Sequence, residues 1–167
     1  KVEEQRKESR LFIYNLIMDE LEEYQKDFPK IQELNQHEHF RTKEVSKKII
    51  SLIDEDESVL LILTDENKNI GMLASELKLE DVVLRVLDDK QASIQKSKYG
   101  RTLGMYAAME GLERATLKAL DNKESAKMQG PFGYTIGMYA AKSKLESAVI
   151  KALENDDYYA IFNNLSN

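Results

Sequence analysis

A dipeptide that recurs at a fixed interval constrains the fold of this chain more than any other feature of the sequence. Gly-Met stands at Gly71, Gly104 and Gly137, so two successive intervals are 33 residues each. When residues 97–121 are compared with residues 130–154, 13 of the 25 positions are identical. Self-similarity at such a period is typical of proteins built from stacked repeats, in which each unit packs on its neighbours. The sequence therefore predicts a row of similar structural units.

The first half of each unit has the signals of a short helix. Asn69, Thr102 and Thr135 directly precede the repeated motif. Side chains of these types accept a hydrogen bond from the free N–H groups of a first helical turn, so each predicts a helix start. Two of these helices carry paired small residues, which let neighbouring helices approach closely: Ala107, Ala108, Ala140 and Ala141.

A turn and a second helix complete the unit. Gly111 fits the left-handed conformation that commonly ends a helix, whereas Lys78 and Lys144 at the equivalent positions must accept strain or a different turn. The second helix has apolar residues at i, i+3, i+4, i+7 and i+8, which predicts one buried stripe. In chain order these residues are Leu79, Val82, Val83, Val86, Leu87; Leu112, Ala115, Thr116, Ala119, Leu120; and Leu145, Ala148, Val149, Ala152, Leu153. Polar residues with turn signals then predict an extended finger between units.

The repeated unit resembles the ankyrin repeat, whose consensus opens Gly-x-Thr-Pro-Leu-His-x-Ala-Ala. The period, the helix caps, the paired alanines and the Gly-x-Thr segment carry the resemblance, which covers residues 65–164. Ile70, Leu103 and Ile136 replace the proline, glycine replaces the leucine, and methionine replaces the histidine. The resemblance implies an all-α solenoid of helix–turn–helix units with finger loops and helical caps at both ends. A tetratricopeptide array is the alternative, but the short first helix and long finger argue against it.

The ends of the chain are expected to differ from the repeats. We expect a capping helical segment over residues 1–36, a degenerate first repeat over 37–68, and three repeats with a C-terminal cap over 69–167. The N-terminal segment has an amphipathic pattern that ends near Pro29, which suits a cap or a coiled-coil dimer helix. The residues of its stripe are Leu11, Tyr14, Met18, Leu21 and Phe28, and those of the expected closing helix are Tyr158, Tyr159, Ile161, Phe162 and Leu165.

The sequence offers few groups for catalysis or metal binding. His37 and His39 are the only histidines, there is no cysteine, and no third ligand is suitably spaced. Asp65, Asn67, Asn69 and Glu76 match part of a calcium loop, but the glycine stands at position 7 instead of 6. Because phosphate-binding loops and nucleophile motifs are also missing, we predict a non-enzymatic protein without metal or cofactor. A hydrolase that uses carboxylates or a metal is the less favoured alternative.

Composition indicates the class of partner. With 30 acidic and 24 basic side chains the net charge is -6, which disfavours nucleic acid and anionic lipid as partners. No apolar run approaches the roughly 20 residues that span a membrane. A protein partner is expected, with a monomer favoured over a homodimer. A cytoplasmic location is favoured, while a secreted or periplasmic one stays open because the first residue is Lys1 instead of Met.

The ankyrin resemblance also implies where the partner binds. In that family the fingers and the first helices share the concave face, and the residues that vary between similar repeats mark contact positions. The predicted partner-binding residues are Lys68, Glu76, Tyr99, Arg101, Met109, Glu110, Phe132, Tyr134, Lys142 and Ser143.

Overall fold

The computed structural model describes residues 1–31 and 37–155, and all regular secondary structure in these ranges is helical. The prediction of an all-α fold is therefore confirmed. The chain divides into two units, Lys1–Ile62 and Leu63–Asn167. None of the helices in the described ranges combines the length and the apolar character needed to cross a lipid bilayer.

The first unit is a pair of long helices. Helix α1 (Val2–Ile31) packs along α2 (His37–Glu55), and the 3-10 helix η1 (Glu57–Leu61) packs on both. The expected capping segment (1–36) and most of the expected degenerate first repeat (37–68) therefore fall in one unit. The buried apolar side chains recur every third or fourth residue: Ile13, Ile17, Leu21 and Tyr24 of α1, with Val45, Ile49 and Ile53 of α2.

Helix α1 continues to Ile31, two residues beyond the proline at which we expected it to end. A proline removes one backbone donor, and in the last turn this costs a single hydrogen bond without breaking the helix behind it. Near this end of the pair, Tyr24 Oη and Thr42 Oγ1 share a hydrogen bond of 2.9 Å. The expected closing helix over Tyr158–Leu165 lies outside the described residues.

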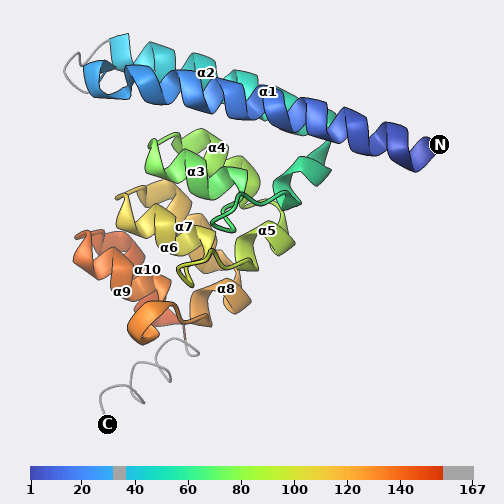
Figure 1. The fold of residues 1–167 in the computed structure, drawn as a ribbon. Helices are drawn as coiled ribbons and strands as arrows, with labels where there is room; N and C mark the ends of the chain where they lie inside the picture. The colour runs from blue at the N-terminus through green and yellow to red at the C-terminus, as the bar shows by residue number, and fades with distance from the viewer. Residues whose placement is uncertain (32–36, 156–167) are drawn as a thin grey trace. The chain divides into compact units, whose positions relative to one another are not determined.

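The second unit contains three helical hairpins in two layers (Figure 1). The first layer contains α3 (Ile70–Glu76), α6 (Leu103–Met109) and α9 (Ile136–Lys142). The second layer contains α4 (Glu80–Val86), α7 (Glu113–Asp121) and α10 (Glu146–Glu154). Helix α6 packs against both α3 and α9, and α7 packs against both α4 and α10. The 33-residue sequence period therefore corresponds to one hairpin.

The start of each first-layer helix is capped as the sequence predicts. The side chains of Asn69, Thr102 and Thr135 accept hydrogen bonds from the backbone N–H three residues ahead, at 3.0, 3.4 and 3.4 Å. These caps satisfy backbone donors that have no partner inside the helix. All three capping residues are buried, so the caps also fix where each finger ends and each helix begins.

The turn inside each hairpin uses one left-handed residue. Lys78 (φ 58°), Gly111 (φ 73°) and Lys144 (φ 61°) occupy equivalent positions, so the two lysines adopt the strained conformation that the glycine adopts freely. After the turn, Leu79, Leu112 and Leu145 donate backbone hydrogen bonds to the carbonyls of Ala74, Ala107 and Ala140 at 3.0, 2.9 and 2.9 Å. Together with the bond from the left-handed residue, this is the Schellman arrangement that satisfies the last carbonyls of a helix.

Two of the recurring glycines, Gly71 and Gly104, lie where adjacent hairpins meet. Gly71, Gly104 and Gly137 are all buried. A Cβ on Gly71 would stand 2.7 Å from Cδ2 of Leu103 and 2.9 Å from Cγ1 of Val86, closer than real Cβ contacts allow. Glycine at this position therefore lets α3 and α6 pack closely.

Two short helices lie where the sequence predicted only extended finger. These are α5 (Lys90–Ile94) and α8 (Lys123–Lys127). The Asp89 carboxylate caps α5 by accepting a hydrogen bond from Ala92 N at 2.9 Å, and Asn122 caps α8 in the same way. Helices of five residues are too short to show an amphipathic stripe, so only their caps could have indicated them.

Candidate functional site

The fingers place one side chain of each unit at an equivalent point, just before a first-layer helix. Each finger closes with a backbone hydrogen bond to the carbonyl of Lys68, Arg101 or Tyr134, at 3.0, 2.9 and 2.7 Å respectively. The residue before each of them is left-handed: Asn67 (φ 57°), Gly100 (φ 77°) and Gly133 (φ 76°). The three fingers thus share one backbone design while presenting different side chains.

Lys68 is the most heavily partnered of these three residues. Its Nζ lies 2.6 Å from Glu76 Oε1 and 3.1 Å from Glu66 Oε2. The same nitrogen lies 5.7 Å from the ring centre of Tyr99 and 5.8 Å from that of Tyr106. Burial would lower the pKa of Lys68, but the hydrogen bonds with Glu76 and Glu66 outweigh it and raise the pKa.

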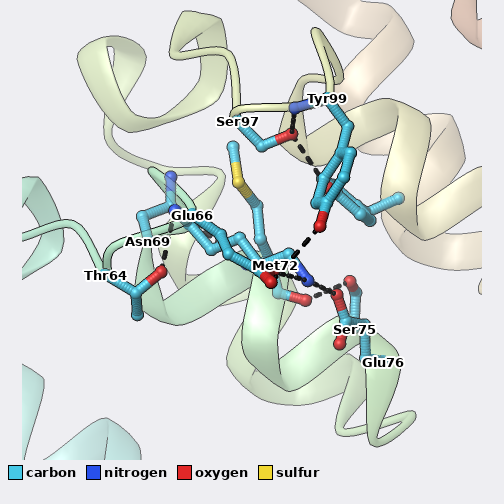
Figure 2. Close-up of polar contacts among 10 residues, drawn as sticks. Thr64, Glu66, Asn69, Met72, Ser75, Glu76, Ser97 and Tyr99 are labelled. Carbon is cyan, nitrogen blue, oxygen red and sulfur yellow. Dashed lines mark hydrogen bonds and ion pairs between the residues drawn. The ribbon is translucent and has the colours of Figure 1, made fainter.

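Figure 2 shows how the second finger meets the first at this point. The Tyr99 hydroxyl donates to Glu66 Oε1 at 3.3 Å, while the Tyr99 backbone N–H donates to Ser97 Oγ at 3.2 Å. Hydrogen bonding to Lys68 is the main cause that lowers the pKa of Glu66, so this carboxyl stays ionised. Lys68 therefore holds its charge between two carboxylates, and its neighbourhood carries no excess of positive charge.

Arg101, the equivalent residue of the second unit, has a different environment. Hydrogen bonding to Tyr139 is the main cause that raises the pKa of Arg101; burial opposes this shift, and Tyr106 contributes in the same direction as Tyr139. The Tyr106 hydroxyl in turn donates to Ser97 Oγ at 2.8 Å. Arg101 Nε is buried and has no hydrogen-bond partner among the described residues.

The third unit continues this pattern with a lysine from the end of α9. Lys142 Nζ lies 5.0 Å from the ring centre of Tyr134. The Tyr134 and Tyr139 rings are tilted by 59° with their centres 5.4 Å apart, a geometry typical of stabilising aromatic pairs. Because Tyr139 also binds Arg101, one pair of rings connects the cation of the second unit with that of the third.

We call this connected set the cation–tyrosine row. Its members, in order, are Lys68, Tyr99, Tyr106, Arg101, Tyr139, Tyr134 and Lys142. Two tyrosines separate each cation from the next, and each lysine–ring contact is typically worth roughly 0.5–2 kcal/mol depending on exposure. Five of the ten predicted binding residues belong to the row, and Glu76 binds its first lysine.

No family model matches this chain, and no curated protein matches it significantly.

The four remaining predicted residues lie outside the row. Met109 ends α6 with its side chain exposed, and its carbonyl accepts a hydrogen bond from Ser143 Oγ at 3.4 Å. Glu110 is half-buried, and burial is the main cause that raises the pKa of its carboxyl. Phe132 is 96% exposed in the turn of the third finger.

The second layer uses its cations differently. Lys118 donates to the carbonyl of Leu84 at 2.9 Å and forms an ion pair with Asp88 of the preceding hairpin. Lys151 repeats this arrangement one unit later, donating to the carbonyl of Leu117 at 3.0 Å and pairing with Asp121. These lysines join adjacent hairpins, so their role is structural.

The candidate metal ligands have other partners in the structure. Asn69 caps α3 and donates to the carbonyl of Ala92 at 3.1 Å, while Glu76 binds Lys68. His37 and His39 lie at the start of α2, but their side chains are outside the described part of the structure. Within the described part, no three His, Cys, Asp or Glu residues gather where they could hold a metal ion.

Sequence reasoning missed three residues of the site. Tyr106 and Tyr139 were not among the predicted binding residues; both are buried, and hydrogen bonding to them raises the pKa of Arg101. Glu66 was not singled out, although it stands 33 residues before Tyr99 and binds both Tyr99 and Lys68. The 33-residue spacing was the available signal, because equivalent finger positions of adjacent units meet in this fold.

Proposed function

We propose that the second unit is a non-enzymatic, ankyrin-type protein-binding module whose partner lies across the cation–tyrosine row. One observation carries the proposal: three successive units present Lys68, Arg101 and Tyr134 on fingers of the same backbone design. The backbone hydrogen bonds of the units recur, while the side chains at this position differ from unit to unit. A surface that varies on a constant framework suits recognition of a specific partner.

The chemistry of the row supports this proposal. Tyrosine, arginine and methionine are enriched at protein interfaces, where a few such residues dominate the affinity. The fingers are fixed by internal hydrogen bonds, so little conformational entropy is lost on binding. In the ankyrin resemblance this face is the concave one, where partners of that family bind.

A capture experiment tests the proposal. We would replace Arg101, Met109 and Tyr134 together with alanine, confirm the fold by circular dichroism, and compare capture from host lysate with that by the wild type. Loss of one or more partners is expected. Lys118 and Lys151 are unsuitable as second-layer controls because they join hairpins. Lys127→Ala on α8 and Glu154→Ala on α10, both at exposed positions, are the matched controls.

Photo-crosslinking then locates the bound surface. A benzophenone amino acid would replace either Phe132, in the third finger, or Ile150, which is 57% exposed on α10. We expect the partner to be crosslinked from position 132 and not from position 150. Crosslinking from position 150 alone, or retention of every partner by the triple variant, would remove the proposed surface.

A second candidate function is self-association through α1. Phe12 is 65% exposed and Leu11 51% exposed, an unusual concentration of large apolar side chains on one helix. Sedimentation over a hundred-fold range of concentration separates the two candidates. A dimer that Phe12→Glu converts to a monomer supports self-association, and a monomer throughout excludes it in that range.

A further inference from the structure

The charged groups of the second unit are partnered unevenly. In the second layer, Arg114 pairs with Glu80 and Asp81, both at 3.0 Å, and Lys118 and Lys151 each pair with an aspartate. At the first end of the cation–tyrosine row, Lys68 pairs with two glutamates. Carboxylates are therefore abundant near most of these cations, as expected for a chain of net charge -6.

Arg101 departs from this pattern. Among the described residues no carboxylate pairs with its guanidinium, which is held by the neutral hydroxyls of Tyr106 and Tyr139 and leaves Nε without a partner. A guanidinium has five N–H donors in a planar fork that matches a carboxylate in two-point geometry. Nε is buried while the residue as a whole is only partly buried, so a partner's carboxylate would meet the terminal nitrogens of the guanidinium. Pairing a guanidinium that has no carboxylate of its own is favourable, because charge-assisted hydrogen bonds are the stronger ones.

Lys142 provides a second positive charge close to the first. Its only recorded partner in the described ranges is the Tyr134 ring, which attracts the ammonium without neutralising it. Since Tyr134 packs on Tyr139 and Tyr139 binds Arg101, the two cations are held on one aromatic pair. Among the described residues, this end of the row thus carries two positive charges that no carboxylate pairs with.

The finger of the third unit places an apolar side chain in the same unit as Lys142. Phe132 (φ 60°) and Gly133 (φ 76°) are both left-handed, so the turn holds a phenylalanine in a conformation that is strained for any residue with a Cβ. Its ring is 96% exposed. Covering an exposed phenylalanine ring is favourable, so Phe132 is suited to insert into an apolar part of a partner.

We infer that this end of the cation–tyrosine row binds an acidic segment of a partner protein, with carboxylates on Arg101 and Lys142 and an apolar residue on Phe132. The inference rests on the proposed function and specifies the chemistry of the partner. Because the chain as a whole is negative, the attraction comes from these two local charges and not from long-range steering. Neutralising either charge therefore weakens binding directly.

Selection from a random peptide library tests the inference. The probe is a phage-displayed library of random dodecapeptides, panned on the whole protein and sequenced. We expect enrichment of peptides with two or more Asp or Glu residues and at least one apolar residue. Fluorescence anisotropy with the selected peptides should show Kd rising at least about ten-fold for Arg101→Gln, the size expected for a charge-assisted hydrogen bond. Lys142→Gln should raise Kd about three-fold, because its charge is more exposed.

Two further variants make the result specific. Arg101→Lys keeps the charge but loses the two-point geometry, so its Kd should lie between those of the wild type and Arg101→Gln. Lys127→Gln removes one positive charge from α8 and should leave Kd unchanged. Lys142 is at an exposed position, so Lys142→Gln keeps the test valid if Arg101→Gln fails to fold.

The outcomes separate this inference from the proposed function. Selected peptides that are neutral or basic, yet lose binding on Tyr134→Ala or Phe132→Ala, overturn the acidic partner and retain the binding surface. Selected peptides whose Kd is unchanged by every variant of the row overturn both the acidic partner and the proposed binding surface. If panning on the folded protein enriches no peptide sequence, the inference of an acidic partner segment is also overturned.

Discussion

Cδ1 of Ile136 lies 2.5 Å from the point that a Cβ on Gly104 would occupy. Helix α9 therefore packs a large side chain directly against the backbone of α6. Leu103 and Gly71 repeat this relationship one unit earlier. In the ankyrin consensus, the position of Ile136 holds proline and that of Gly104 holds leucine. The isoleucine at one position and the glycine at the other are thus physically linked, since the isoleucine side chain occupies the space that the glycine leaves open.

This relationship predicts that Gly104→Ala destabilises the protein. In most helices the change would be favourable, but here the new Cβ would also meet Cβ of Ala119 at 2.8 Å, and that atom can move only with α7. We expect the free energy of unfolding to fall by about 1–3 kcal/mol, as for other overpacked cores. Urea unfolding measures it, and an unchanged or higher stability would remove this account of the glycines.

Ile136→Ala in the Gly104→Ala background provides the matched control. Shortening Ile136 opens a cavity on its own, but in the double variant part of that space receives the new methyl group. The double variant should therefore lose less stability than the sum of the two single losses. Strict additivity would show that the two positions do not share the space.

The left-handed turns give a second prediction. Gly111 has φ 73° and open space around its Cα, so Gly111→Ala tests backbone strain without a steric clash. We expect a loss of about 1 kcal/mol, the typical cost of a left-handed residue with a Cβ. Lys144→Gly, at the equivalent turn with φ 61°, should raise stability by about 0.5–1 kcal/mol. Changes of the opposite sign in thermal unfolding would contradict the assigned turns.

A third prediction concerns the lysines that join second-layer helices. Lys151→Met keeps most of the apolar stem but removes the hydrogen bond to the carbonyl of Leu117. The expected loss is about 1 kcal/mol, because the ion pair with exposed Asp121 adds little in water. Lys127→Met on α8 is the control, with little change expected. Equal effects in chemical unfolding would show that the interhairpin bond is unimportant.

A fourth prediction follows from Glu110. Burial, the largest cause, raises its carboxyl pKa above the ordinary 4.5, so the folded state binds more protons than the unfolded state between 4.5 and the raised value. Stability therefore falls as pH rises through that window, and the ionised carboxylate destabilises the fold at neutral pH. Glu110→Gln should melt at a higher temperature than the wild type at pH 7. The difference should vanish below pH 4.5, and a difference that grows on acidification would refute the assignment.

The fifth prediction is that metal removal leaves stability unchanged. Asn69 and Glu76 are engaged in the α3 cap and with Lys68, so the calcium-like sequence pattern lacks two of its four ligands. Exhaustive dialysis against a chelator should not move the melting temperature. A drop that one particular ion restores would show a metal site that this reasoning has missed.

The framework of the second unit was predictable because local interactions specify it. The caps at Asn69, Thr102 and Thr135 and the turn at Gly111 depend on residues close in sequence, whose preferences are known. The repeat then copies each element with its boundaries. Even the strained turns at Lys78 and Lys144 followed from their alignment with Gly111.

The arrangement of the site was less predictable because its contacts join different units. The fingers bring Lys68 to Tyr99 and Arg101 to Tyr139, and these pairs depend on how side chains of successive hairpins interleave. Tyr139 was not among the predicted binding residues, because its place in a helix gives no indication that its hydroxyl contacts a cation of the neighbouring unit. Six of the ten residues predicted from the sequence belong to the cation–tyrosine row or bind one of its members. The sequence did not indicate which of the charges lack a carboxylate partner among the described residues.

The interhairpin bonds of the second layer have a consequence for how such a chain can lengthen. Lys118 reaches the carbonyl of Leu84 and Lys151 that of Leu117, each across 34 residues. The ion pairs of the same lysines with Asp88 and Asp121 each span 30 residues. A tandem duplication of one 33-residue stretch would add one hairpin. At both of its junctions, the lysine of one hairpin would still face the carbonyl and the aspartate that it contacts now. Gene duplication could therefore extend the array in a single event, without a destabilised intermediate.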